Sequence, residues 1–143
     1  MILQILGAAL GVVGGSIFLQ APKRILPAAA FLGSTGWAAY LLAHQSFDAI
    51  TSTFISGLVI TTLSHLLARF SKMPVTVYLI PGVLPLVPGV ALYQTVAEFI
   101  KGSYKADAYL RETFLIAGMI ALSIFVVDSL VKALERYTKN ASI

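Results

Sequence analysis

The sequence predicts an all-α integral membrane protein with about five transmembrane helices, the fourth of them discontinuous at a region rich in proline and glycine. Of its 143 residues, 58% are hydrophobic and only 11% are charged, whereas a soluble domain carries about 25% charged residues. The mean hydropathy is +0.89. A chain of this length cannot bury so many apolar side chains in one small core, so we expect a lipid environment.

Five apolar segments approach or exceed the roughly 20 residues that a helix needs to cross the hydrocarbon of a bilayer. They cover about residues 2–19, 25–43, 49–70, 74–100 and 113–131. Short connections join them, so residues 1–143 are expected to form a single transmembrane domain without a soluble module. The first residues, "MILQILGAALGVVGG", contain no basic region before the apolar run, so we expect no cleaved signal peptide.

Basic residues indicate the orientation, because cytoplasmic loops carry an excess of lysine and arginine. If all five segments span, seven of the ten basic residues share one side: Lys23, Arg24, Arg69, Lys72, Lys132, Arg136 and Lys139. This places the N-terminus outside and the C-terminus in the cytoplasm, in a multi-pass protein of the cell (cytoplasmic) membrane. With a re-entrant fourth segment, Lys101, Lys105 and Arg111 would join the cytoplasmic set and the C-terminus would leave it. The count is again seven to three, so charge leaves both topologies open. The length of residues 74–100 favours a span.

Small residues at intervals of four predict close helix packing, which is what holds helices together inside lipid. In the first segment, two interpretations are open: its glycines pack within the chain, or their face contacts another chain in a higher oligomer. The residues at this spacing are Gly7, Gly11 and Gly15 in the first segment, Thr53, Gly57 and Thr61 in the third, and Ala117 and Ala121 in the fifth.

The fourth segment is interrupted by three prolines and two glycines, Pro81, Gly82, Pro85, Pro88 and Gly89. Proline lacks the donor N–H and clashes with the preceding turn, and it disfavours a helical conformation in the residue before it. We therefore predict two half-helices, about Pro74–Ile80 and Pro88–Lys101, joined by an unwound "PGVLPLV". Pro88 is expected at the first helical position, where proline is favoured.

Such a break indicates a transport function, because an unwound backbone survives in lipid only where protein or a watery cavity lines it. Secondary transporters form their solute sites with discontinuous helices. The free N–H groups of Gly89, Val90 and Ala91 would point at the cavity, where they favour an anion such as a carboxylate. Tyr93 and Gln94, on the next turn, would add hydrogen bonds. The alternative is that the prolines only kink a structural helix.

Ionisable residues at membrane depth are further candidates for function. Asp128 and His65 are expected at similar depths, and we predict that they lie close enough to relay protons, since histidine titrates near neutral pH. The alternative is that each is satisfied locally, Asp128 by Lys132 one turn away. Glu98 is a third candidate for proton coupling; it either lines an outer vestibule or pairs with Lys101.

The sequence does not predict an enzyme, a metal site or a cofactor. It has no cysteine and two widely separated histidines, and no carboxylates stand at ligand spacing. No nucleophile stands beside a base. The basic residues lie at the ends of apolar segments rather than on a soluble face, so we expect no nucleic-acid partner.

The run "FISGLVITTLSHLLARFSKMPVTVYLIPGVLPLVPGVALY" resembles the threonine/serine exporter (ThrE-type) family, and most closely the small, YjjB-like membrane subunit of its two-component form. The core "IPGVLPLVPGVALY" carries most of the likeness, and "FLGSTGWAAYLL" adds to it. The resemblance implies export of small carboxylates, either threonine and serine or a dicarboxylate such as succinate. It also implies a larger, YjjP-like partner subunit.

Residues and resemblance together predict the membrane subunit of a proton-coupled secondary exporter. Two alternatives are a structural or assembly subunit whose partner holds the whole site, and a homo-oligomeric channel. The expected substrate path comprises Pro81, Gly82, Pro85, Pro88, Gly89, Val90, Ala91, Tyr93 and Gln94.

Overall fold

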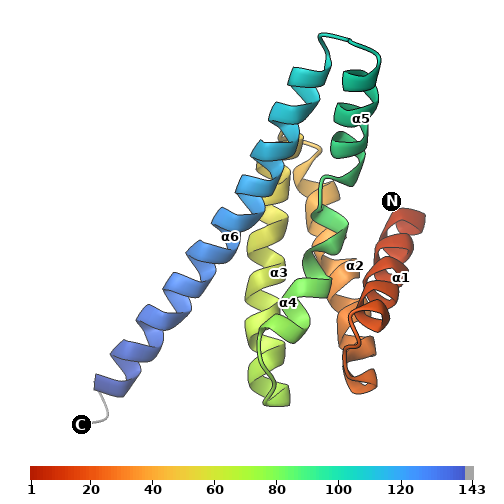
Figure 1. Ribbon diagram of the computed structural model, residues 1–143. Coiled ribbons are helices and arrows are strands. Elements are labelled where there is room, and N and C mark those ends of the chain that lie inside the picture. Colours follow the sequence, from red (N-terminus) through yellow and green to blue (C-terminus); the bar gives the residue numbers. More distant parts are fainter. Residues whose placement is uncertain (141–143) are drawn as a thin grey trace.

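The computed structural model is a bundle of helices that run up and down beside one another (Figure 1). It describes the backbone of residues 1–140 and the side chains of residues 1–137, so the Lys139 side chain and residues 141–143 lie outside. Every regular element in the described part is helical. The elements are α1 (Ile2–Phe18), η1 (Lys23–Ile25), α2 (Leu26–Ala43), α3 (Ala49–Ser71), α4 (Thr76–Val83), η2 (Leu84–Leu86), α5 (Gly89–Ile100) and α6 (Ala106–Asn140).

Three helical stretches are long and apolar enough to cross a membrane, namely Lys23–Ala43, Ala49–Ser71 and Ala106–Tyr137. The bent pair Thr76–Leu86 and Gly89–Ile100 makes a fourth if its two parts form one span. Helix α1 is apolar but has only 17 residues. The all-helical membrane class is thus supported with three or four spans, while the fifth stays a prediction.

The helix ends follow from local sequence signals. Pro27 stands in the first turn of α2, where its missing N–H is not needed. Helix α3 ends at Lys72, which adopts the left-handed conformation with φ 53°. Helix α6 begins at Ala106, not near residue 113 as predicted, and Asp107 in its first turn suits the positive end of the helix dipole. The expected connection before residue 113 is therefore largely helical.

Helix α3 lies at the centre of the bundle and packs against both α2 and α6 through small residues, as the spacing predicted. Thr53, Gly57 and Thr61 are all buried. A Cβ atom on Gly57 would lie within van der Waals overlap of the Ser123 side chain on α6. On the side facing α2, the Ser56 hydroxyl donates a hydrogen bond of 2.6 Å to the Gly36 carbonyl.

The packing face predicted for the fifth segment is wrong. Ala117 and Ala121 are exposed, and the buried side chains in the described part of α6 are Ala106, Ile116, Ser123 and Val127. The physical reason is the close approach of Ser123 to Gly57, which turns the alanines outward.

The glycines of α1 divide between the two interpretations. Gly15 packs against Leu84 of η2 within the chain, whereas Gly7 and Gly11 are exposed and a Cβ atom on either would meet nothing within 4 Å. Helix α1 instead buries Val12 and Ser16 toward the bundle. The face of Gly7 and Gly11 is therefore open to lipid or to another chain.

Candidate functional site

The break in the fourth segment is shorter than predicted. The expected unwound stretch is mostly helical, because α4 continues through Pro81 to Val83 and η2 follows directly. Pro81 removes one hydrogen bond of α4 and is buried, while Pro85 stands in the first turn of η2, where its missing N–H is tolerated. Only Val87 and Pro88 lie outside the helices, and Pro88 caps α5 instead of occupying its first position.

Helices α4–η2 and α5 meet at this break with a bend of 50°. The Gly89 N–H, predicted to be free, donates a 2.7 Å hydrogen bond to the Val87 carbonyl. The Leu92 N–H is bound by the Pro88 carbonyl at 3.0 Å. Between them, the N–H groups of Val90 and Ala91 donate to no backbone acceptor within residues 1–140. Two of the three predicted donors therefore remain available.

A cavity of about 280 Å³, here called the break cavity, lies beside these donors. Helices α2, α3 and α6 supply its other walls. Its lining comprises Trp37, Tyr40, Ala49, Thr53, Pro85, Leu86, Val87, Pro88, Gly89, Val90, Ala91, Gln94, Glu112 and Ile116. The broken backbone is thus lined by protein and a cavity, the surroundings that a break at membrane depth requires.

Most of the predicted path residues line the break cavity, but three do not. Pro85, Pro88, Gly89, Val90, Ala91 and Gln94 line it. Pro81 and Gly82 are buried, and a Cβ atom on Gly82 would overlap the Leu32 side chain of α2. The Tyr93 side chain is 73% exposed and lies outside the lining. The predicted path residues that share this cavity therefore lie between Pro85 and Gln94, without Tyr93.

Two residues that the sequence reasoning missed also line this cavity. Glu112 is half-buried and forms no hydrogen bond or ion pair with any described side chain. The indole N–H of Trp37 is buried and finds no acceptor among the described residues, which is uncommon for a buried donor. Glu112 could have been predicted from Asp107, because an acidic residue is favoured in the first turn of a helix. A helix that begins at this point contains Glu112 and places it one turn before Ile116.

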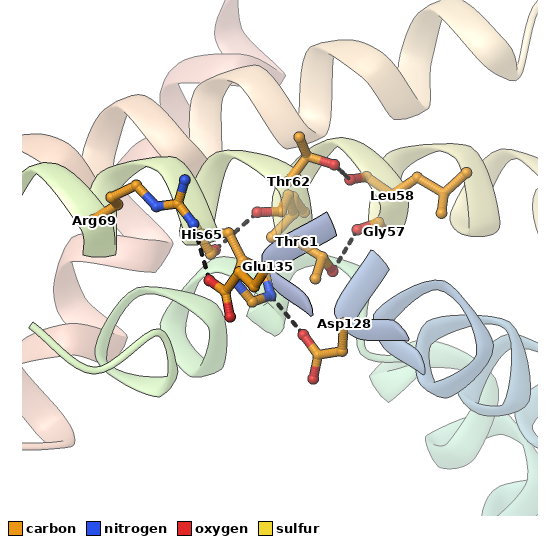
Figure 2. Close-up of polar contacts among 10 residues, drawn as sticks. Gly57, Leu58, Thr61, Thr62, His65, Arg69, Asp128 and Glu135 are labelled. Carbon is orange, nitrogen blue, oxygen red and sulfur yellow. Dashed lines mark hydrogen bonds and ion pairs between the residues drawn. The ribbon is translucent and has the colours of Figure 1, made fainter. Parts of the chain in front are cut away.

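His65 and Asp128 are brought together from α3 and α6, as Figure 2 shows. His65 Nε2 lies 2.5 Å from Asp128 Oδ1, and the two side chains are 20% and 36% exposed. Among the described side chains, Asp128 therefore pairs with His65 and not with Lys132. This is the juxtaposition that the relay hypothesis requires; the relay itself stays a prediction.

A second interhelical pair lies one turn further along α3, where Arg69 donates a hydrogen bond of 2.9 Å to Glu135 Oε1 (Figure 2). Both of its side chains are largely exposed. His65, Arg69 and Glu135 line a cavity of about 580 Å³ between α3 and α6 whose other walls are mostly apolar. We call it the ion-pair cavity.

Glu98, the third candidate for proton coupling, lies near the end of α5 and accepts a hydrogen bond of 2.9 Å from Lys101 Nζ. The neighbouring carboxylate raises the pKa of Lys101, chiefly through this hydrogen bond. Of the two expectations, local pairing is the one that the structure matches. Glu98 does not line the break cavity.

The two cavities lie toward opposite ends of α3. Thr53 lines the break cavity and His65 lines the ion-pair cavity, and twelve helical residues correspond to about 18 Å. One cavity adjoins two free backbone amides and a carboxylate, and the other adjoins an imidazole–carboxylate pair. This arrangement suits the binding of a small polar solute at one level and the movement of a proton at another.

Comparison with known families agrees with this geometry. The family model described as "Threonine/Serine exporter, ThrE" matches residues 4–130, which include every residue that lines the break cavity. Three residues of the ion-pair cavity, Val131, Leu134 and Glu135, lie beyond the match. No solved structure matches the chain. The family is one of membrane exporters, and the three apolar helical stretches fit such a protein. The chain therefore belongs to the threonine/serine exporter (ThrE) family.

Proposed function

We propose that this chain is the membrane subunit of a secondary exporter for small carboxylates, and that its break cavity holds the solute. Family membership supports export of threonine and serine, and a dicarboxylate such as succinate fits the same donors. The observation that carries the proposal is the cavity at the break, where the N–H groups of Val90 and Ala91 lie without a backbone acceptor. A carboxylate is the natural ligand for helix N-terminal amides.

The buried indole N–H of Trp37 supports a ligand in the same place. It is a donor without an acceptor on a residue that lines the cavity, and leaving a buried donor unsatisfied costs about 1–3 kcal/mol. Its nitrogen has no exposed surface, so a solute oxygen would satisfy it once the indole turns toward the cavity. Gln94 and the Tyr40 hydroxyl supply further polar groups at the cavity wall.

Proton coupling through His65 and Asp128 is part of the proposal. Their contact of 2.5 Å places an imidazole against a carboxylate within the helical bundle, and histidine exchanges protons near neutral pH. If the N-terminus lies outside, the break cavity occupies the outer half of the membrane and the pair occupies the cytoplasmic half. Reporter fusions at the two ends would test this orientation, because an odd number of spans puts the ends on opposite sides.

A larger, YjjP-like subunit completes the exporter in this proposal, as the resemblance to the two-component form indicates. The open face of Gly7 and Gly11 offers one surface for contact with another chain. If the chain were only an assembly subunit, changes in the break cavity would leave export intact. If it were a homo-oligomeric channel, export would not require the larger subunit.

The test removes one cavity amide. Val90→Pro deletes the N–H in the first turn of α5, where proline is tolerated, and Val90→Ala keeps it as the matched control. A hydrogen bond to a charged group contributes about 1.5–3 kcal/mol, so we expect the KM for export to rise about 10- to 100-fold in Val90→Pro alone. The assay measures threonine, serine and succinate in membrane vesicles that contain both subunits. Equal kinetics in the two variants would contradict the proposal.

A further inference from the structure

We infer that Glu112 determines the solute specificity of the break cavity by binding an ammonium group, so that the cavity takes a zwitterionic amino acid and rejects a dicarboxylate. This inference rests on the proposed function, because it assumes that the break cavity is the solute site. It goes further by deciding between the two solute classes that the amide donors alone admit.

The Glu112 side chain is half-buried at the wall of the cavity, in a helix that qualifies as a membrane span. Three other acidic side chains have ion-pair partners, since Glu98 pairs with Lys101, Asp128 with His65 and Glu135 with Arg69. Glu112 pairs with no described residue. Taking a carboxylate out of water costs free energy unless a cation pairs with it, and a cationic group of a solute that fills the cavity would be that partner.

An aromatic wall also lines the cavity that Glu112 lines. The Trp37 and Tyr40 rings stack with centroids 4.9 Å apart, and Tyr40 stacks on His44 with centroids 5.4 Å apart. Ammonium groups are attracted to the faces of such rings within about 6 Å. Because Tyr40 stacks with both neighbours, Trp37 is the residue of this wall that would contribute such an attraction.

Hydrogen-bond donors and an acceptor lie on different walls of the cavity. Helix α5 contributes N–H donors at Val90 and Ala91, and α6 contributes the acceptor Glu112. A zwitterion satisfies both kinds of group at once. A dicarboxylate would bring a second negative charge to the wall that already carries Glu112, and like charges at close range repel.

The size of the cavity agrees with a small amino acid. Its volume of about 280 Å³ corresponds to roughly nine water molecules at about 30 Å³ each. A solute of the size of threonine or serine fits this space.

The test changes the charge of Glu112 and leaves its shape. In vesicles containing the assembled exporter, Glu112→Gln is expected to raise the KM for threonine by about 10-fold or more and to lower that for succinate. Asp107→Asn is the matched control, because it removes a carboxylate from an exposed position on the same helix. The amount of assembled exporter in the membrane is measured for each variant. An unchanged ratio of the two KM values in Glu112→Gln would overturn the inference.

A second measurement needs no variant. Threonine and 3-hydroxybutyrate share a carbon skeleton, a hydroxyl and a carboxylate, and differ in the ammonium group. We expect 3-hydroxybutyrate to compete for export by the unaltered protein about 10-fold less well than threonine. Equal competition would overturn the role of Glu112 and leave the proposed function intact. If the unaltered exporter moved neither threonine nor succinate, the proposed function itself would fail.

Discussion

His65 Nε2 lies 2.5 Å from Asp128 Oδ1, a contact that joins α3 to α6 across 63 positions of sequence. Both groups come from helices that qualify as membrane spans. Titratable residues at such depth are rare outside functional sites. The pair is therefore the first place at which to look for proton coupling.

Neutralising either member of the pair should uncouple export from the proton gradient. We expect Asp128→Asn and His65→Gln each to reduce gradient-driven export by about 10-fold or more, because each removes a group that takes up and releases a proton. Lys132→Gln is the control, since Lys132 is exposed one turn away on the same helix. Export is measured in vesicles with and without an imposed gradient. Coupling that persists in both pair variants would show that they do not carry the proton.

The contact of α3 with α6 should depend on the absence of a side chain at Gly57. The methyl group added in Gly57→Ala would overlap the Ser123 side chain. Overpacking of this kind lowers the free energy of unfolding by about 1–3 kcal/mol. We expect a lower thermal unfolding temperature in detergent. Ser123→Gly in the same chain should restore part of the loss, while no rescue would mean that the two positions do not limit the packing.

Helix positions were predictable from the sequence where apolar runs end in clear signals. The bounds of α1, α2 and α3 agree with the predicted segments to within one or two residues. Pro81 and Pro85 misled the prediction, because both occupy helical positions where a missing N–H is tolerated or offset by burial. How far a proline disrupts a helix depends on its position within the turn and on its neighbours, which one sequence does not reveal.

The open glycine face of α1 should matter for association and not for the fold of one chain. We expect Gly7→Leu combined with Gly11→Leu to lower the apparent mass of the complex in detergent, because close backbone approach requires small residues. Gly118→Leu is a matched control on α6, where a Cβ atom also meets nothing within 4 Å. An unchanged mass in the double variant would assign the face to lipid.

The candidate site was only partly predictable. The amides after Pro88 and the pairing of His65 with Asp128 followed from helix-end chemistry and from similar depth. Trp37 and Glu112 did not, because their role depends on which sides of α2 and α6 face the break. Tyr93 shows the same difficulty in reverse, since it is adjacent to Gln94 in sequence but its side chain lies outside the cavity.

That last contrast provides the most direct test of the central claim, that the break cavity holds the solute. The chain has no cysteine of its own, so Gln94→Cys and Tyr93→Cys each introduce a single thiol, one in the cavity lining and one outside it. Reaction with a water-soluble maleimide is followed in the assembled exporter, with and without saturating threonine or succinate. The account predicts that one of these solutes slows the reaction of Cys at position 94 by about 10-fold and leaves position 93 unaffected. An unchanged rate at position 94 with both solutes, or equal slowing at both positions, would contradict it.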